Sequence, residues 1–209
     1  QKANEMDGVI VTSNQARSGF VGSAYTLQDE TGQAVQKLVC NTPVEVVHYG
    51  VKNVNPANID LKLKYDFNFL TVAQMGPRKN LAPMIKWFAE EFHNDEVGFV
   101  VKANIANNSQ IDRVKLRNSI ESVLKPFGED RQCKVHMIHG NMSDDEVHAL
   151  YTDPKVKAYI TATHGEGFGL PIFEAAYSGL PVVAPAWSGH VDFLYAPVVN
   201  AKSKKTTIK

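Results

Sequence analysis

From residue 67 to residue 185 the sequence alternates between short apolar runs rich in β-branched residues and longer segments whose apolar residues have helical spacing. This alternation is typical of β-α-β units, in which crossover helices join parallel strands. Right-handed crossovers leave few topologies for such a chain. The sequence therefore predicts an α/β fold, a Rossmann-like, doubly wound parallel sheet with helices on both faces.

Individual elements of this region can be placed by periodicity and by capping residues. Ser143 and Glu146 form the pattern of a capping box, and Pro171 and Gly179 mark the first turn and the end of the last helix. The expected strands are residues 67–74, 97–103, 133–139, 157–163 and 181–185, and the expected helices are residues 80–92, 109–127, 143–153 and 171–179.

The first 66 residues are less regular. A β-branched run predicts a strand at residues 8–12, and Ser13 is a plausible N-cap for a helix that ends near Gly22. The remaining expectations are a second helix over residues 29–39, a strand over residues 44–50 and a loop over residues 52–64.

Composition excludes several classes of function. The formal net charge of the 209 residues is zero, so no global field directs the chain to nucleic acid or to a membrane. No apolar run approaches the ~20 residues that span a bilayer. Cys40 and Cys133 lie far apart and outside any CxxC pair, which favours free thiols in a reducing compartment and predicts no zinc site.

The stretch THGEGFGLPIFEA, residues 163–175, places three glycines and two glutamates where a predicted strand gives way to a helix. Ligands of open parallel sheets bind outside the carboxyl ends of the strands. Glycines let the backbone approach a ligand, and the helix N-terminus favours an anion. Glu174 lies roughly opposite the expected core face with Ile172 and Ala175, so we expect it to meet a ligand, and its acceptors suit sugar hydroxyls.

Simpler interpretations of this loop remain open from the residues alone. Glycine-rich turns end many strands, Glu174 could merely complement the helix dipole, and Glu166 could be an ordinary loop charge. A nicotinamide-binding loop is a third alternative. That fingerprint belongs to the first β-α unit, whereas this loop comes after several such units.

The longer stretch THGEGFGLPIFEAAYSGLPVVAP, residues 163–185, resembles the donor-site signature of retaining glycosyltransferases of the GT-B fold, glycosyltransferase family four (group 1). That signature has one glutamate, seven residues and a second glutamate, and Glu166 and Glu174 keep this spacing. The resemblance covers most of residues 8–194, through GVIVTSNQARSGF (8–20), HYGVKN (48–53), VAQMGPRKNL (72–81) and HGNMSDDEVHALY (139–151).

The resemblance implies one half of a two-domain fold. Family members have two Rossmann-like domains that face each other, and the C-terminal domain holds a nucleotide sugar donor. On this basis residues 1–43 are expected to be a remnant of the N-terminal acceptor domain with the linker. Residues 44–209 are expected to be the Rossmann-like donor domain, truncated at its C-terminus. The partner is then a missing N-terminal domain or a separate subunit.

Roles for individual residues follow from the same resemblance. Glu166 is expected to be catalytic, holding hydroxyls of the transferred sugar and supporting developing charge, and Glu174 is expected to bind the ribose. The resemblance places Arg78, Lys79, Phe168, Gly169 and Leu170 at the donor diphosphate, Asn141 and Met142 in the base pocket, and His164 and Gly167 at the donor sugar.

The sequence departs from the family pattern at a few positions. Gln74 stands where many members have an arginine, and His164 replaces a common serine. After the signature, Gly189 and Asp192 are the candidates for positions where the family often has two glycines and a glutamate.

The implied function is transfer of a hexosyl group from a nucleoside diphosphate sugar to a glycan, lipid or small-molecule acceptor, with retention of anomeric configuration. No cofactor, metal or nucleic acid is expected, and this chain alone should turn over poorly. The alternatives are a nucleotide-sugar-binding module without activity, as in a split transferase, and a nucleotide-sugar epimerase on the same fold. The expected location is cytoplasmic, with the inner face of a membrane as an alternative for the intact protein.

Overall fold

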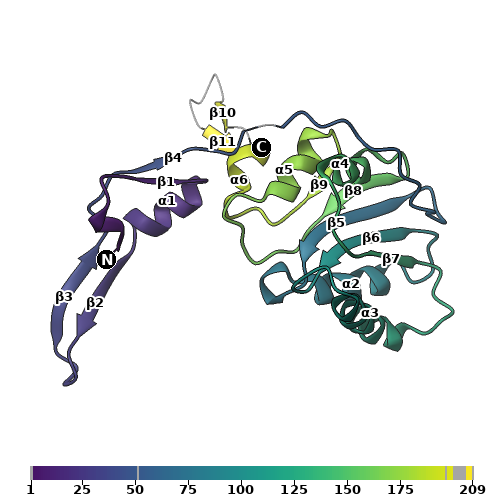
Figure 1. The fold of residues 1–209 in the computed structure, drawn as a ribbon, viewed down its shortest axis with the longest axis horizontal. Coiled ribbons are helices and arrows are strands. Elements are labelled where there is room, and N and C mark those ends of the chain that lie inside the picture. The colour runs from purple at the N-terminus through teal and green to yellow at the C-terminus, as the bar shows by residue number, and fades with distance from the viewer. Residues whose placement is uncertain (1, 51, 196, 200–205, 209) are drawn as a thin grey trace. The chain divides into compact units, whose positions relative to one another are not determined.

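The computed structural model describes residues 2–50, 52–195, 197–199 and 206–208 and divides into two compact units. The sheet unit comprises Lys52–Gly165 and Leu170–Ala186, and the N-terminal unit comprises Gln1–Val51, Glu166–Gly169 and Trp187–Lys209. Figure 1 labels the elements of both. Each unit is described by itself.

A five-stranded parallel sheet forms the centre of the sheet unit, with strand order β7-β6-β5-β8-β9. The strands are β5 Asn68–Gln74, β6 Gly98–Asn104, β7 Lys134–Ile138, β8 Val156–Ile160 and β9 Val182–Val183. The helices are α2 Leu81–Glu91, α3 Gln110–Leu124, α4 Asp144–Thr152 and α5 Leu170–Tyr177, with short 3-10 helices η2 Pro77–Lys79 and η3 Lys125–Phe127. The predicted α/β class and doubly wound sheet are confirmed.

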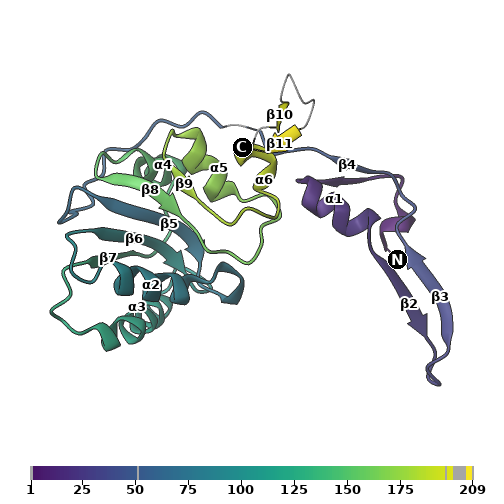
Figure 2. The ribbon, with the colours of Figure 1, turned by 180° about the vertical axis from the view of Figure 1, so that it is seen from behind.

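The direction of winding reverses between β5 and β8. The chain adds β6 and β7 on one side of β5, then returns to add β8 and β9 on the other side. As a result, α2 and α3 cover one face of the sheet and α4 and α5 cover the other (Figures 1 and 2). In such folds, ligands bind at the carboxyl ends of the strands where this reversal occurs.

The main core lies between the sheet and the pair α2 and α3. Ile85 and Phe88 are three residues apart on α2, and both are buried against Phe99 and Val101 of β6 together with Leu116 of α3. Full burial of one such side chain contributes about 1.5–3 kcal/mol. The apolar residues whose helical or alternating spacing predicted these elements are therefore the residues that pack together in one core.

Capping residues define the ends of the helices as expected. Ser143 and Glu146 form the capping box of α4, since the Ser143 hydroxyl accepts from Glu146 N at 3.2 Å and the Glu146 carboxylate accepts from Ser143 N at 2.7 Å. Gly179 follows α5 with φ of 78°, a conformation that glycine adopts without steric cost.

In the N-terminal unit, strands β1 and β4 pair in parallel, with Val9 opposite Val44. Its elements are η1 Lys2–Glu5, β1 Val9–Val11, α1 Asn14–Val21, β2 Ala24–Gln28, β3 Ala34–Val39, β4 Val44–Val46, α6 Val191–Leu194, β10 Pro197–Val199 and β11 Thr206–Ile208. The predicted division at residues 43 and 44 stays a prediction. Residues 200–205 and 209, at the end of the predicted donor domain, lie outside the described residues.

The predicted helix over residues 29–39 is wrong, because β2 and β3 form an antiparallel hairpin there. Asp29 closes its turn by accepting from the amides of Thr31 and Gln33 at 2.9 and 3.0 Å, and Gly32 supplies a φ of 82°. Local hydrogen bonds of this kind compete with helix formation. Among the described residues, no helix is long and apolar enough to cross a membrane.

Two isoleucines on α3 test the assignment of the core. Ile120 is 5% exposed and belongs to the core, whereas Ile111 is 69% exposed. We expect Ile120→Ala to lower the free energy of unfolding by about 2–5 kcal/mol in urea denaturation, because it leaves a cavity. Ile111→Ala is the matched control and should change it by less than about 0.5 kcal/mol. Equal effects of the two substitutions would contradict this packing.

Candidate functional site

The loops that leave β5 and β8 meet at the reversal point of the sheet. The backbone N–H of His164 donates to the carbonyl of Arg78 at 2.8 Å, and the Arg78 guanidinium donates to the carbonyl of Gly165 at 2.5 Å. The basic loop after the first strand and the start of the glycine loop are thus joined, although 87 residues separate Arg78 from Gly165.

A pocket of about 410 Å³ opens at the carboxyl ends of β5 and β6. Its lining residues come from the two strand ends, the loop after each and the first turn of α5, and they are Val72, Ala73, Gln74, Lys79, Lys102, Ala103, Asn104, Ala106 and Pro171. A helix N-terminus favours negative charge, as do lysine side chains. The pocket can therefore hold an anion such as a phosphate.

Glu174 projects from α5 and is exposed at the surface, and a neighbouring helix holds one of its two carboxylate oxygens. Its Oε2 accepts a hydrogen bond from the buried Tyr151 hydroxyl of α4 at 3.0 Å. Partial removal of the carboxylate from water raises the pKa of Glu174. Within the described part of the chain, Oε1 accepts no hydrogen bond, so one oxygen remains for a ligand hydroxyl.

Residues 166–169 group with the N-terminal unit. There the Ser188 hydroxyl lies 2.8 Å from both the N–H and the carbonyl oxygen of Glu166, and the N–H of Gly189 donates to the same carbonyl at 3.0 Å. A Cβ on Gly189 would lie 2.1 Å from the carbonyl oxygen of Gly167, so these two backbones require glycine at position 189. The backbone that presents Glu166 is therefore held by residues 188 and 189.

The Phe168 side chain is buried in an aromatic cluster of the N-terminal unit. Its ring centroid lies 5.8, 5.2 and 4.9 Å from those of His48, Tyr49 and Phe193. Gly169 follows with φ of 96°, a conformation that favours glycine. The ring packs inside this unit, so a ligand role for residues 168 and 169 would rest on their backbone, as the resemblance implies.

Asp192, a candidate from the sequence, joins three segments of the same unit. Its Oδ2 accepts from the backbone N–H and the side-chain amide of Asn14, at 2.7 and 3.1 Å, and lies 3.1 Å from Nε2 of His48. Asn14 begins α1, where a carboxylate also complements the helix dipole. In this structure Asp192 has a positioning role.

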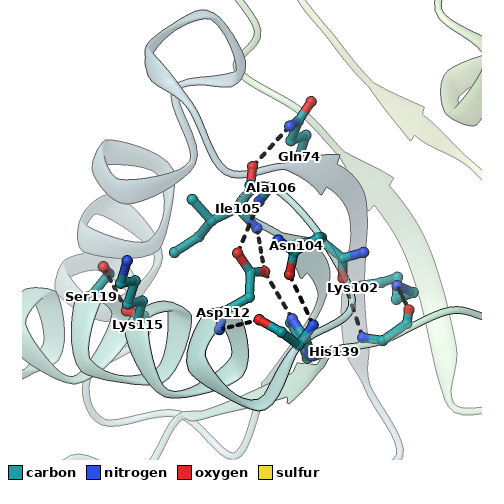
Figure 3. Close-up of polar contacts among 12 residues, drawn as sticks. Gln74, Lys102, Asn104, Ile105, Ala106, Asp112, Lys115, Ser119 and His139 are labelled. Carbon is teal, nitrogen blue, oxygen red and sulfur yellow. Dashed lines mark hydrogen bonds and ion pairs between the residues drawn. The ribbon is translucent and has the colours of Figure 1, made fainter.

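The predicted base-pocket residues Asn141 and Met142 follow a turn at Gly140, whose φ is 112°. Two residues of β6 hold this turn (Figure 3). The Lys102 ammonium donates to the carbonyl of Gly140 at 2.6 Å, and the N–H of Gly140 donates to Oδ1 of Asn104 at 3.2 Å. Sequence reasoning missed Lys102 and Asn104, although a lysine in the apolar run VGFVVKA was a visible irregularity.

His139, the residue before Gly140, contacts the buried Asp112 of α3, as Figure 3 shows. Nε2 of His139 lies 2.9 Å from Oδ2 of Asp112, and the Asp112 carboxylate also accepts from the amides of Ile105 and Ala106, each at 2.9 Å. Burial alone would raise the pKa of Asp112, but the hydrogen bonds from His139 and these amides hold it at about 2. Sequence reasoning missed both residues of this pair.

The structure thus distributes the predicted site residues between its two units. The sheet unit holds Arg78, Lys79, Asn141, Met142, His164, Leu170 and Glu174, and the N-terminal unit holds Glu166, Gly167, Phe168 and Gly169. Their ligand roles stay predictions. Among the described residues, no group of three or more His, Cys, Asp or Glu side chains could hold a metal ion.

The pKa of Asp112 makes a prediction about acid stability. A carboxylate with a folded pKa of about 2 and an unfolded pKa of about 3.9 stabilises the fold fully above about pH 4, and this contribution is lost as the pH falls toward 2. We expect the difference in urea midpoint between the wild type and Asp112→Asn to shrink as the pH is lowered from about 5 to about 3. A constant difference would show that the Asp112 charge does not act in this way.

Comparison with known proteins agrees with this fold. The model of a family described as glycosyl transferases group 1 matches residues 58–196, more than half of the chain. Among curated proteins, a sucrose synthase from Denitrovibrio acetiphilus is 28% identical over 134 residues, covering 59% of this chain and 16% of the sucrose synthase. The chain thus spans about a sixth of that relative.

Solved structures are similar at low sequence identity. A glycosyltransferase from Rickettsia africae has a TM-score of 0.60 and 18% identity, over 91% of this chain and 47% of its own. A UDP-forming trehalose-phosphate synthase from Burkholderia xenovorans has a TM-score of 0.59 and 14% identity. The match covers 89% of this chain and 48% of the synthase chain. An E. coli protein described as trehalose-6-phosphate and bound with UDP-2-fluoro glucose has a TM-score of 0.59 and 12% identity. The match covers 90% of this chain and 48% of the E. coli chain. These likenesses show the fold, and the chain spans about half of each.

Proposed function

Because this chain belongs to the glycosyl transferases group 1 family, we propose that its sheet unit is the donor half of a retaining hexosyltransferase. The donor is a nucleoside diphosphate sugar, and the acceptor is a glycan, a lipid or a small molecule. One observation carries this proposal: Lys79, Lys102 and the first turn of α5 line one pocket at the carboxyl ends of β5 and β6. Fixed cations and a helix N-terminus can stabilise a departing diphosphate without a metal.

The role of each residue follows the order of groups along a nucleotide sugar. Arg78 and Lys79 neutralise the diphosphate, which also receives backbone N–H groups near Leu170. Oε1 of Glu174 accepts a hydrogen bond from a ribose hydroxyl while Tyr151 keeps Oε2 in place. Asn141 and Met142 line the base. A carboxylate that is already held by a buried tyrosine loses little freedom when the ribose binds.

The proposed transfer is a front-face displacement. The bond from the anomeric carbon to the diphosphate oxygen breaks, and the acceptor oxygen bonds to the same face of that carbon. The acceptor proton passes to the departing phosphate oxygen. Glu166 supports the positive charge that develops on the sugar, with His164 and Gly167 near its hydroxyls.

The N-terminal unit supports the part of the proposal that concerns a missing partner. Parallel strand pairs normally lie within covered sheets, but Ile10 of β1 is 73% exposed. Tyr25 and Val35 of the hairpin are each 67% exposed. An isolated two-stranded hairpin is at best marginally stable in water. We therefore propose that this unit completes its fold with an acceptor domain or with a separate subunit.

Thermal unfolding in the presence of nucleotides tests the donor assignment. We expect one of UDP, GDP or ADP, or its sugar, to stabilise the chain by about 2.7 kcal/mol at a hundred times its Kd, raising Tm by a few degrees. Glu174→Ala should abolish the shift, because it removes the ribose acceptor. Glu121→Ala, an exposed glutamate on α3, is the matched control. If no nucleotide raises Tm in the wild type, the donor assignment fails.

Product analysis distinguishes the transferase from the alternatives. With the stabilising nucleotide sugar alone, we expect NMR spectra to show neither epimerised donor nor free nucleoside diphosphate above a protein-free blank. Turnover should appear when an acceptor and a polypeptide that supplies the acceptor half are both present. Conversion of the donor sugar by this chain alone would favour the epimerase. Binding without turnover under every condition would favour the binding module.

A further inference from the structure

Lys102 is a buried cation flanked by apolar residues of β6. Its neighbours in β6, Val100, Val101 and Ala103, are buried hydrophobic residues, and Lys102 itself is only 8% exposed. Within the described part of the chain, its ammonium has no carboxylate partner and makes one hydrogen bond, to the carbonyl of Gly140 (Figure 3). Burial accordingly lowers the pKa of Lys102. Buried charges without an opposite charge are costly, so this site favours an anion.

The pocket beside Lys102 has the chemistry that such an anion requires. In the parallel register, Lys102 lies opposite Val72 and Asn104 lies opposite Gln74, so the three polar side chains share one face of the sheet. Lys79 and the first turn of α5 line the same pocket. No acidic residue is among the described residues that line it. Two cations, two amides and a helix N-terminus therefore surround one space.

Lys102 also connects this pocket to the turn that precedes the predicted base contacts. Both backbone polar groups of Gly140 are hydrogen-bonded to side chains of β6. Its carbonyl accepts from Lys102, and its N–H donates to Asn104. An ammonium has three N–H donors, so the bond to Gly140 leaves two for a phosphate. One side chain can thus touch a phosphate and fix the turn.

We propose that Lys102 binds the diphosphate of the nucleotide donor while it holds the turn of residues 139–142 in its binding conformation. This inference rests on the proposed function, because it names a further group that contacts the donor of the same site. If Lys102 has both roles, a phosphate group bound in the pocket changes the environment of residues 139–142 even when no base is attached to it.

Isothermal titration with inorganic pyrophosphate, with UDP and with uridine tests the binding role. We expect Lys102→Met to raise the Kd of pyrophosphate and of UDP by about tenfold or more, because the substitution removes charge-assisted hydrogen bonds to the phosphate groups. Lys102→Gln keeps an N–H donor for Gly140 but has no charge. It should raise the Kd of both ligands by a similar factor. Lys115→Met, on the exposed face of α3, is the matched control and should bind as the wild type does.

NMR of the backbone amides tests the link to the turn. In the wild type, pyrophosphate should shift the amide resonances of Gly140 and Asn141, and Lys102→Met should lose these shifts. The variant is expected to fold, since replacing an unpaired buried charge with an apolar side chain is often neutral or stabilising. An unchanged Tm without ligand is the control for folding.

The possible outcomes separate this inference from the proposed function. Wild-type affinity of Lys102→Met for pyrophosphate and UDP would overturn the role of Lys102, even if Glu174→Ala still loses nucleotide binding. Lys102-dependent binding of pyrophosphate, with no stabilisation by any nucleotide, would support the phosphate site and reject the donor function. Pyrophosphate binding without any shift at Gly140 would overturn the link to the turn.

Discussion

The reversal of winding between β5 and β8 is the constraint on which the rest of the sheet unit depends. Because β5 pairs in parallel with β6 on one side and β8 on the other, the loops that leave β5 and β8 emerge at one edge. Backbone groups at strand ends need hydrogen-bond partners once they are shielded from water. The bonds between Arg78 and the segment from His164 to Gly165 meet this need. The basic loop and the start of the glycine loop are consequently joined at this edge, beside the pocket where we propose that the diphosphate binds.

Two buried charged side chains with different environments lie near the carboxyl end of β6, Asp112 of α3 and Lys102 of β6. Asp112 accepts hydrogen bonds from His139 and from the amides of Ile105 and Ala106, and its carboxylate is satisfied within the protein. Lys102 belongs to β6 itself, and among the described residues its ammonium donates a hydrogen bond to the Gly140 carbonyl alone. A satisfied buried charge stabilises one backbone conformation, whereas an under-satisfied one favours a ligand of opposite charge. This contrast separates the structural charge of the region from the one that we assign to binding.

Much of the sheet unit could be predicted because its elements are long and strongly periodic. The β5 strand, the α2 helix and the capping box of α4 all follow from local patterns that the tertiary structure reinforces. The turn and β3 of the hairpin, residues 29–39, were predicted as a helix, and Ala34, Val35, Leu38 and Val39 are compatible with helical spacing as well as with a strand. The Asp29 carboxylate and the positive φ of Gly32 decided the outcome there. Short apolar segments carry too little periodicity to settle such a choice.

The sequence by itself determined the α/β class, the family, and the spacing that links Glu166 to Glu174 through the glycine loop. Each of these depends on residues that are close together in the chain. Only the tertiary structure decided that Tyr151 would hold Glu174, and that Lys102 and Asn104 would hold the turn at Gly140. The physical reason is that such contacts join residues 23 to 38 positions apart, and they form only once the sheet register and the packing of α4 against α5 bring those residues together.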